Sequence, residues 1–279
     1  MKALLAFEPS HQDKERLKGM YDTLSSLAGS PSHVEVGFVA TSTKSLTSDS
    51  RRLIKQELKN AQIPLADKKI HVVEFATSSN TKTVDRLLKL AKERGAKILG
   101  LFTHAREGYL RFVIGSFAET AIHRSKCSLL ILNPQTQVAT QIKNILFASD
   151  FSPASKTQLK TVISHCKNLK SKLTVLYHAD LNYEWSLDES NPKIQAYRRG
   201  VGKMKTWIEQ ECQKVGVAAE VMICTELKST GDLILQNITK KKVNLVVVGA
   251  KVGPFAALIG GSVTRQIVRG SQVPVLVLK

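Results

Sequence analysis

The sequence lacks the features that mark several large classes of protein. It has four cysteines in 279 residues, and none lies in a CxxC pair or at a metal-ligand interval from a histidine. We therefore expect reduced thiols, as in a cytoplasmic protein, rather than a disulfide framework. No apolar run approaches the length of a membrane span, and Glu8 interrupts the first apolar residues too early for a signal peptide.

Motifs of common enzymes are also missing. The sequence contains no GxxxxGK[ST] loop, no GxGxxG after its first predicted strand and no GxSxG elbow. Its seven histidines never fall at metal-ligand spacing, and carboxylates near the predicted strand ends are single rather than paired. His178 ends a predicted strand, where packing or a hydrogen bond is its expected role. We expect a binding module with no catalytic residues and no metal site, not an enzyme.

Positive charge is in large excess. Lys and Arg number 41 against 23 Asp and Glu, which gives a net charge of +18. Residues 1–142 hold 21 basic and 13 acidic residues, and residues 143–279 hold 20 and 10, so the excess is spread evenly. Such a charge attracts polyanions or nucleotide phosphates. Because no Cys/His finger and no aromatic ribonucleoprotein motif occurs, we favour a lysine-rich solvated surface over nucleic-acid binding.

The chain contains an internal repeat. The first strands of the two copies align at an offset of 142 residues, and the last strands align at an offset of 146. The matched segments include Leu4–Ser10 with Leu146–Ser152, Gly115-Ser116 with Gly261-Ser262, and Ser128–Leu132 with Pro274–Leu278. A polar, uncharged segment at 133–142 separates the copies. We therefore predict two tandem domains, at 1–135 and 143–279.

Each half alternates short apolar runs with helical patterns. The strands are predicted at 3–7, 34–40, 69–75, 97–102, 128–132, 144–149, 172–178, 218–223, 244–249 and 274–278. The helices are predicted at 11–28, 46–60, 80–94, 116–125, 153–168, 193–215, 229–240 and 262–270. Alternating strands and helices indicate α/β domains, each a doubly wound five-stranded parallel sheet. Pairing of the two last strands would close two apolar sheet edges and relate the domains by a pseudo-twofold axis.

A glycine-bearing loop in the second half is the strongest candidate site. The buried strand ends at Gly249, Gly253 follows in the loop, and Gly261-Ser262 opens a helix. A helix start offers free N–H groups and a positive dipole end to an anion, although Gly-Ser is equally a simple helix cap. Asp150 ends the first strand of this half, where it either caps the next helix or contacts a ligand. The acidic stretch 180–191 is either a lid or, as we favour, a solvated connection.

These residues resemble the universal stress protein family in its tandem form. The resemblance covers nearly the whole chain, and the opening strand with Asp150 and the closing segment from Gly261 to Leu278 carry it most clearly. It implies an adenine nucleotide alpha hydrolase-like fold. It assigns the adenosine end of ATP to Asp150 and the Ala179 backbone. It assigns the ribose and phosphates to glycines and the turn formed by Gly261, Ser262 and Val263.

The glycine spacing departs from the family pattern. The family has two residues between its first two glycines and nine before Gly-Ser, whereas here three residues separate Gly249 from Gly253 and seven separate Gly253 from Gly261. Lys251 stands where the second glycine is expected. In the first half Phe102 and Ala105 replace the glycines, so we expect that domain not to bind ATP in the usual way.

The resemblance implies a cytoplasmic stress-response protein that binds ATP, with Mg²⁺ as an open question, in its second domain. It would act as a regulatory binding module toward a protein partner that the sequence does not identify. The alternative is a scaffold in which both nucleotide sites are degenerate. Homodimerisation of the whole chain stays open, and neither membrane nor nucleic acid is an expected partner.

Overall fold

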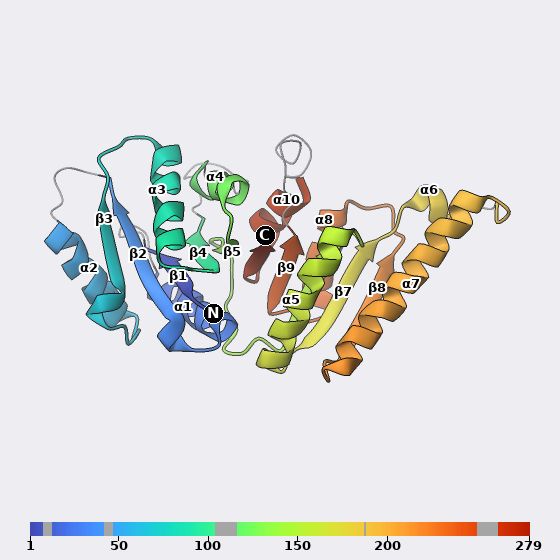
Figure 1. The fold of residues 1–279 in the computed structure, drawn as a ribbon, viewed down its shortest axis with the longest axis horizontal. Helices are drawn as coiled ribbons and strands as arrows, with labels where there is room; N and C mark the ends of the chain where they lie inside the picture. The colour runs from blue at the N-terminus through green and yellow to red at the C-terminus, as the bar shows by residue number, and fades with distance from the viewer. Residues whose placement is uncertain (8–12, 42–46, 104–115, 187, 250–261) are drawn as a thin grey trace. The chain divides into compact units, whose positions relative to one another are not determined.

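A computed structural model describes residues 1–7, 13–41, 47–103, 116–186, 188–249 and 262–279 (Figure 1). The chain divides into two compact units. Unit 1 contains Met1–Thr140 together with Ala250–Lys279, and unit 2 contains Gln141–Gly249. The last helix and strand of the second repeat therefore belong to the same compact unit as the first repeat. Along the part of the chain that the structure describes, none of the helices is long and apolar enough to cross a membrane.

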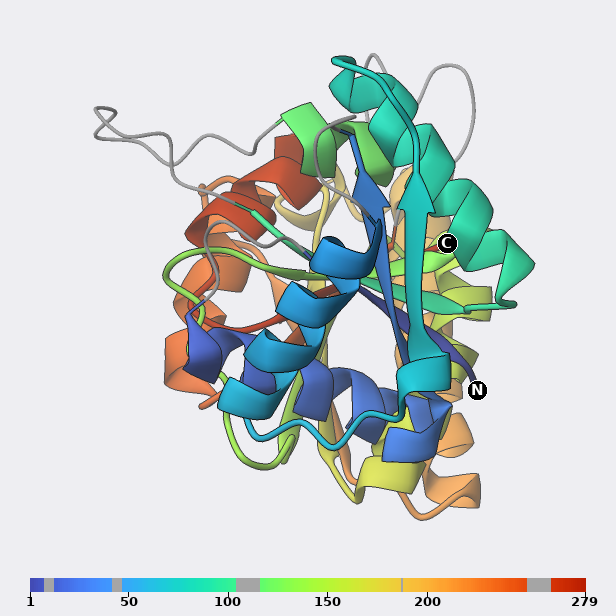
Figure 2. The ribbon, with the colours of Figure 1, turned by 90° about the vertical axis from the view of Figure 1, so that its left-hand side faces the viewer.

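Unit 1 is a sheet with helices on both faces. Its strands follow the order β3-β2-β1-β4-β5-β10, and all neighbours are parallel except β5 and β10. The strands are β1 (Ala3–Ala6), β2 (Val34–Ala40), β3 (Ile70–Glu74), β4 (Ile98–Phe102), β5 (Ser128–Leu132) and β10 (Val275–Leu278). The helical elements are α1 (Lys14–Ala28), η1 (Pro31–His33), α2 (Thr47–Asn60), η2 (Asp67–Lys69), α3 (Asn80–Glu93), α4 (Ser116–Arg124) and α10 (Ser262–Gly270). Figure 2 shows α2 and α3 on opposite sides of β2 and β3.

The core of unit 1 is closely packed around β4. All five residues of this strand are buried, as expected for a central parallel strand. A Cβ added to Gly100 would lie 2.8 Å from Leu24 Cδ1 and 2.9 Å from Met20 Sδ. Glycine therefore allows α1 to approach the strand to a distance that a larger residue would prevent.

The last strands of the two repeats pair antiparallel. Leu130 of β5 lies opposite Leu276 of β10, and these two residues are equivalent at the repeat offset of 146. A pseudo-twofold axis therefore passes between them, because only a position on the axis can face its own equivalent. The predicted pairing of 128–132 with 274–278 is confirmed, and these two strands are related by the local pseudo-twofold.

The residue that follows the last strand of each repeat forms a hydrogen bond to the end of a helix from the other repeat. The Asn133 side chain is 3% exposed, and its Nδ2 donates to Val268 O at 2.8 Å and to Ser271 O at 2.7 Å. This amide satisfies carbonyl groups at the end of α10 that have no partner inside the helix. At the equivalent position Lys279 donates to Ile122 O near the end of α4. The two repeats thus cap each other's final helix.

Unit 2 is a four-stranded parallel sheet in the order β9-β6-β7-β8. Its strands are β6 (Asn144–Ser149), β7 (Lys172–His178), β8 (Ala219–Cys224) and β9 (Leu245–Gly249). Its helices are α5 (Pro153–Leu169), α6 (Leu181–Glu184), α7 (Pro192–Lys214) and α8 (Thr230–Lys240). In Figure 1, α5 and α7 lie side by side on the face of the sheet toward the viewer. The predicted α/β class with mostly parallel sheets is confirmed.

The segment 180–191 is an anchored connection in its described residues. The Asp180 carboxylate caps α6, a short helix that the sequence analysis missed, by accepting from Asn182 N. Arg198 of α7 donates to Glu184 O and to Ser186 O, each at 3.0 Å. The Tyr197 hydroxyl accepts from Asp180 N at 2.8 Å. These bonds hold both ends of α6 to α7, which supports the preferred interpretation of a connection.

Candidate functional site

The carboxyl edge of unit 2 contains a topological switch point. From β6 the chain adds β7 and β8 on one side, and β9 then returns to pair with β6 on the other side. Ligands of open parallel sheets bind where connections from adjacent strands diverge in this way. Asp150 directly follows β6 and Gly249 is the last residue of β9, so two of the predicted site residues flank the switch point.

Asp150 performs a local structural role with one carboxylate oxygen. Its Oδ1 accepts from Ser152 N at 3.0 Å, and Ser152 in turn caps α5 by accepting from Ser155 N. Within the described residues, Oδ2 of Asp150 takes part in no hydrogen bond, and the residue is exposed. Both roles considered for Asp150 are therefore compatible, because the cap uses one oxygen and leaves the other for a ligand.

Ala179 follows β7 and is 4% exposed. Its backbone N–H donates to Cys224 O of the neighbouring strand at 2.9 Å. A ligand at this position would therefore meet the carbonyl oxygen of Ala179, since the N–H is already used. A carbonyl oxygen accepts hydrogen bonds, such as one from a ribose hydroxyl or an exocyclic amine.

Gln158 of α5 is a site residue that the sequence analysis missed. A Cβ added to Gly249 would lie 2.2 Å from Gln158 Oε1 and 3.0 Å from its Cδ. The space that a side chain at position 249 would need is therefore occupied by the Gln158 amide, which lies against the end of β9. A ligand group placed beside Gly249 would therefore contact or displace this amide.

The equivalent pair in unit 1 has diverged. Arg16 lies in α1 at the repeat offset of 142 from Gln158, and Phe102 ends β4 as Gly249 ends β9. The Arg16 guanidinium carbon lies 5.4 Å from the centroid of the Phe102 ring, a cation–π arrangement. Burial lowers the pKa of Arg16 from its ordinary value, and Phe102 is 9% exposed. The switch point of unit 1 is thus occupied by protein side chains.

Two aromatic rings stack at the carboxyl ends of the neighbouring strands β6 and β7. The Phe151 ring stacks on the Tyr177 ring with centroids 4.2 Å apart and an interplanar angle of 7°. Phe151 has a φ of 56°, a left-handed conformation that is costly for a residue with a side chain. Burial and the hydrogen bond to Tyr197 raise the pKa of Tyr177. The stack provides an apolar wall beside Asp150.

His178 at this edge is hydrogen-bonded through both ring nitrogens. His178 Nδ1 lies 2.8 Å from Thr230 Oγ1, and its Nε2 lies 3.3 Å from Glu226 O, so the expected hydrogen-bonding role is confirmed. In the described ranges, no group of three His, Cys, Asp or Glu side chains is arranged to hold a metal ion.

The remaining predicted site residues lie in the last part of the chain. Gly253 and Gly261, with Lys251, lie outside the described residues. Ser262 is the first residue of α10, and Val263 follows it as a half-buried residue of the same helix. The helix start predicted at 262 is therefore present, whereas the geometry of the turn before it stays a prediction.

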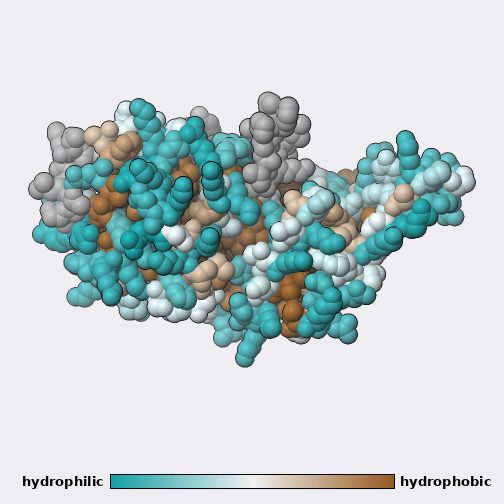
Figure 3. Space-filling view, in the orientation of Figure 1, coloured by the Kyte–Doolittle hydropathy of each residue, from teal (hydrophilic) through white to brown (hydrophobic). Residues whose placement is uncertain are grey.

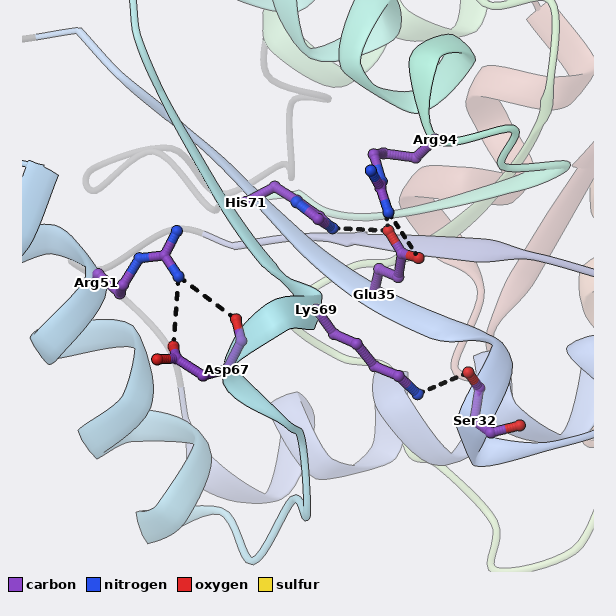
Figure 4. A network of polar contacts seen from close by, with 7 residues as sticks. All are labelled: Ser32, Glu35, Arg51, Asp67, Lys69, His71 and Arg94. Atoms are coloured by element: carbon purple, nitrogen blue, oxygen red, sulfur yellow. Dashed lines mark hydrogen bonds and ion pairs between the residues drawn. The ribbon is translucent and has the colours of Figure 1, made fainter.

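A second polar cluster lies at the opposite, amino-terminal end of the strands in unit 1 (Figure 4). The Glu35 carboxylate accepts from Arg94 Nε at 2.7 Å and contacts His71 Nε2 at 2.7 Å. Burial of Glu35 opposes ionisation, but the hydrogen bonds from Arg94 and His71 outweigh it and lower the pKa of this carboxyl. These contacts join β2, β3 and the end of α3, so the cluster stabilises that part of unit 1.

Two doubly wound repeats, paired through their last strands, define a tandem α/β protein of the adenine nucleotide alpha hydrolase type. The chain belongs to the universal stress protein family, whose model matches residues 32–133 and 141–279. A universal stress protein from Archaeoglobus fulgidus has 18% identity and a TM-score of 0.66, with 99% of this chain and 98% of that chain covered. A protein of unknown function from Pseudomonas aeruginosa has 16% identity and a TM-score of 0.65, with 100% and 92% covered. No curated protein matches the sequence.

Proposed function

We propose that the second repeat binds an adenine nucleotide, ATP, as a regulatory binding module of the stress response. The observation that carries this proposal is the placement of Asp150 and Gly249 on the two sides of the switch point of unit 2. A free carboxylate oxygen, a buried carbonyl at Ala179 and an adjacent aromatic wall suit a flat, hydrogen-bonding base and its ribose. For the phosphates, the family resemblance assigns Gly261, Ser262 and Val263 of the second repeat, and that part of the proposal rests on the resemblance alone.

The proposal excludes the first repeat from binding in the same way. Phe102 and Arg16 fill the position that Gly249 and Gln158 occupy in unit 2. A nucleotide there would have to displace a buried ring and a guanidinium group, which is more costly than moving the end of one glutamine side chain.

The proposed role is binding rather than catalysis. Among the described residues of the site, His178 is hydrogen-bonded to Thr230 and to the Glu226 carbonyl, and Asp150 is hydrogen-bonded to the Ser152 backbone, so neither is held by a second titratable side chain. Phosphoryl transfer requires a positioned general base together with charge stabilisation. Mg²⁺ would accompany ATP through the phosphates, with Asp150 as an indirect ligand. In this proposal the protein lies in the cytoplasm and passes its nucleotide-bound state to a protein partner.

A scaffold that binds no nucleotide is the competing function. The Gln158 amide against Gly249 and the shortened glycine spacing both favour it. In that case the two repeats would serve only as a paired structural platform.

Isothermal titration of the full chain with ATP at low salt separates these functions. We expect saturable heat, accompanied by a change in the fluorescence of Trp185, which is 51% exposed after α6. Gly261→Asp introduces a negative charge at the phosphate turn and should abolish the heat, whereas the matched Gly115→Asp in the first repeat should preserve it. Absence of heat at millimolar ATP in the wild type and in Gln158→Ala would establish the scaffold instead.

A further inference from the structure

We propose that α5 and α7 of unit 2 form a docking surface for the phosphate backbone of double-helical nucleic acid. The surface is a set of exposed lysines on the outer sides of these two helices, and we call it the lysine face. Its members are Lys156, Lys160, Lys167, Lys203 and Lys214. The proposal concerns a part of unit 2 away from the nucleotide site and does not rest on ATP binding.

The lysines of the face form a stripe on each helix. On α5, Lys156, Lys160 and Lys167 are spaced at i, i+4 and i+11, which places them on one side of the helix. On α7, Lys203 and Lys214 share the same spacing, with Trp207 and Glu211 between them at i+4 and i+8. All five lysines are exposed.

Contacts between the helices bring the two stripes together. Lys156 Nζ lies 4.4 Å from the centroid of the Trp207 ring. The pKa of the Glu211 carboxyl is lowered first by the hydrogen bond from Lys214, and further by the charges of Lys160 and Lys156. Lys156 and Lys160 therefore face the α7 stripe, in which Glu211 is the one acid.

The charge of this helix pair is not shared by its counterpart in unit 1. Helices α5 and α7 contain nine Lys and Arg and two Asp and Glu, and α5 contains no acid at all. Helices α1 and α2, which follow the equivalent strands, contain seven basic and four acidic residues. The sequence suggested an evenly spread charge, but these two helices carry nine minus two, or +7, of the +10 excess of residues 143–279, and five of their nine basic residues belong to the lysine face. Hydrophilic side chains along α7 are visible on this surface in Figure 3.

The shape and chemistry of the face favour a duplex over other polyanions. At 1.5 Å per residue the helices are about 26 Å and about 35 Å long, close to one turn of a double helix of about 34–36 Å. Insertion into a membrane interface uses apolar side chains, and none of the exposed large hydrophobic residues in the described ranges lies on α5 or α7. Single-strand binding uses open aromatic rings, whereas Lys156 covers Trp207.

The test is titration of a fluorescein-labelled duplex of random sequence with the full-length protein, over a series of salt concentrations. We expect the logarithm of the association constant to fall linearly with the logarithm of the salt concentration. In Lys160→Glu/Lys167→Glu/Lys203→Glu the association constant at low salt should fall at least about tenfold, and the salt slope should decrease by about 2.7, or 0.9 per lost phosphate contact.

The matched control changes the same net charge elsewhere. Lys82→Glu/Lys89→Glu/Lys92→Glu reverses three exposed lysines of α3 in unit 1 and should weaken binding by no more than about threefold, through long-range attraction alone. If the Glu variant does not fold, Lys160→Gln/Lys167→Gln/Lys203→Gln takes its place in the same titration. Equal losses in both triple variants, no duplex binding at low salt, or binding only to phosphatidylserine vesicles would overturn the proposal.

Discussion

Glu119 of α4 and Arg265 of α10 form an ion pair of 3.3 Å although they occupy the same position in the two repeats. Their numbers differ by 146, the offset that also relates β5 to β10. In a symmetric dimer of two identical domains, the residue at this position would face its own copy across the axis, and the two like charges would repel each other. Duplication within one chain allows the two copies to differ, so opposite charges can face each other.

Reversing one charge of this pair should destabilise unit 1, and reversing both should restore it. Arg265→Glu would place two carboxylates together, and we expect a loss of about 1 kcal/mol in the free energy of unfolding, because the pair is partly exposed. Glu119→Arg/Arg265→Glu should recover most of that loss. Urea denaturation of the two single variants and the double variant provides a double-mutant cycle. Strictly additive effects would contradict the interaction.

Loss of the Asn133 amide should loosen the end of α10. Asn133→Ala leaves the carbonyls of Val268 and Ser271 without their buried donor, and we expect a loss of about 1–3 kcal/mol. Hydrogen exchange should become faster in α10 and β10 before it changes elsewhere. Gln135→Ala, an exposed substitution two residues away, is the control and should change stability by less than about 0.5 kcal/mol.

The Glu35 cluster should make part of the stability depend on pH. The pKa of Glu35 in the folded protein lies below its ordinary value of 4.5. Its contribution is therefore fully present above that ordinary value and is lost as the pH falls through the lower folded value. Glu35→Gln should destabilise the protein at pH 7 and have a much smaller effect at strongly acidic pH. Glu74→Gln, exposed at the end of β3, should show no such pH dependence in denaturant titrations.

Two glycines at strand positions should respond differently to alanine. In Gly100→Ala the new methyl meets Leu24 and Met20, which are fully buried, so we expect a loss of about 1–3 kcal/mol from overpacking. In Gly249→Ala the three nearest atoms all belong to the amide at the far end of the flexible Gln158 side chain, so we expect a smaller loss, below about 1 kcal/mol. Thermal unfolding of both variants measures the difference. If Gly249→Ala costs as much as Gly100→Ala, the Gln158 amide is held rigidly.

The fold could be predicted largely from the periodicity of the sequence. The strands 34–40, 128–132, 144–149 and 172–178 have the predicted bounds, because each is an apolar run between clear turn or helix signals. The short helix α6 was missed, since its four residues show no apolar period and only the Asp180 cap indicates it. The packing of α10 and β10 with the first repeat depends on contacts between distant segments, which local patterns do not contain.

The candidate site could be predicted only in part. Asp150 and Gly249 were found because strand ends and glycines are visible in the sequence, and the fold places both at one switch point. Gln158 was not found, although it occupies the same repeat position as Arg16. Its role depends on how closely α5 approaches the end of β9, and that distance is set by tertiary packing. The phosphate turn at Gly261 stays a prediction.

The pairing of β5 with β10 has a consequence for synthesis of the chain on the ribosome. The strand that covers the edge of β5 follows the whole of unit 2 in the sequence, so it emerges only after unit 2 has been translated. Until then the nascent first repeat presents an unpaired apolar strand, which is prone to associate with other chains. Nascent chains of this protein should therefore need chaperone protection of the first repeat for longer than nascent chains of a single-repeat protein.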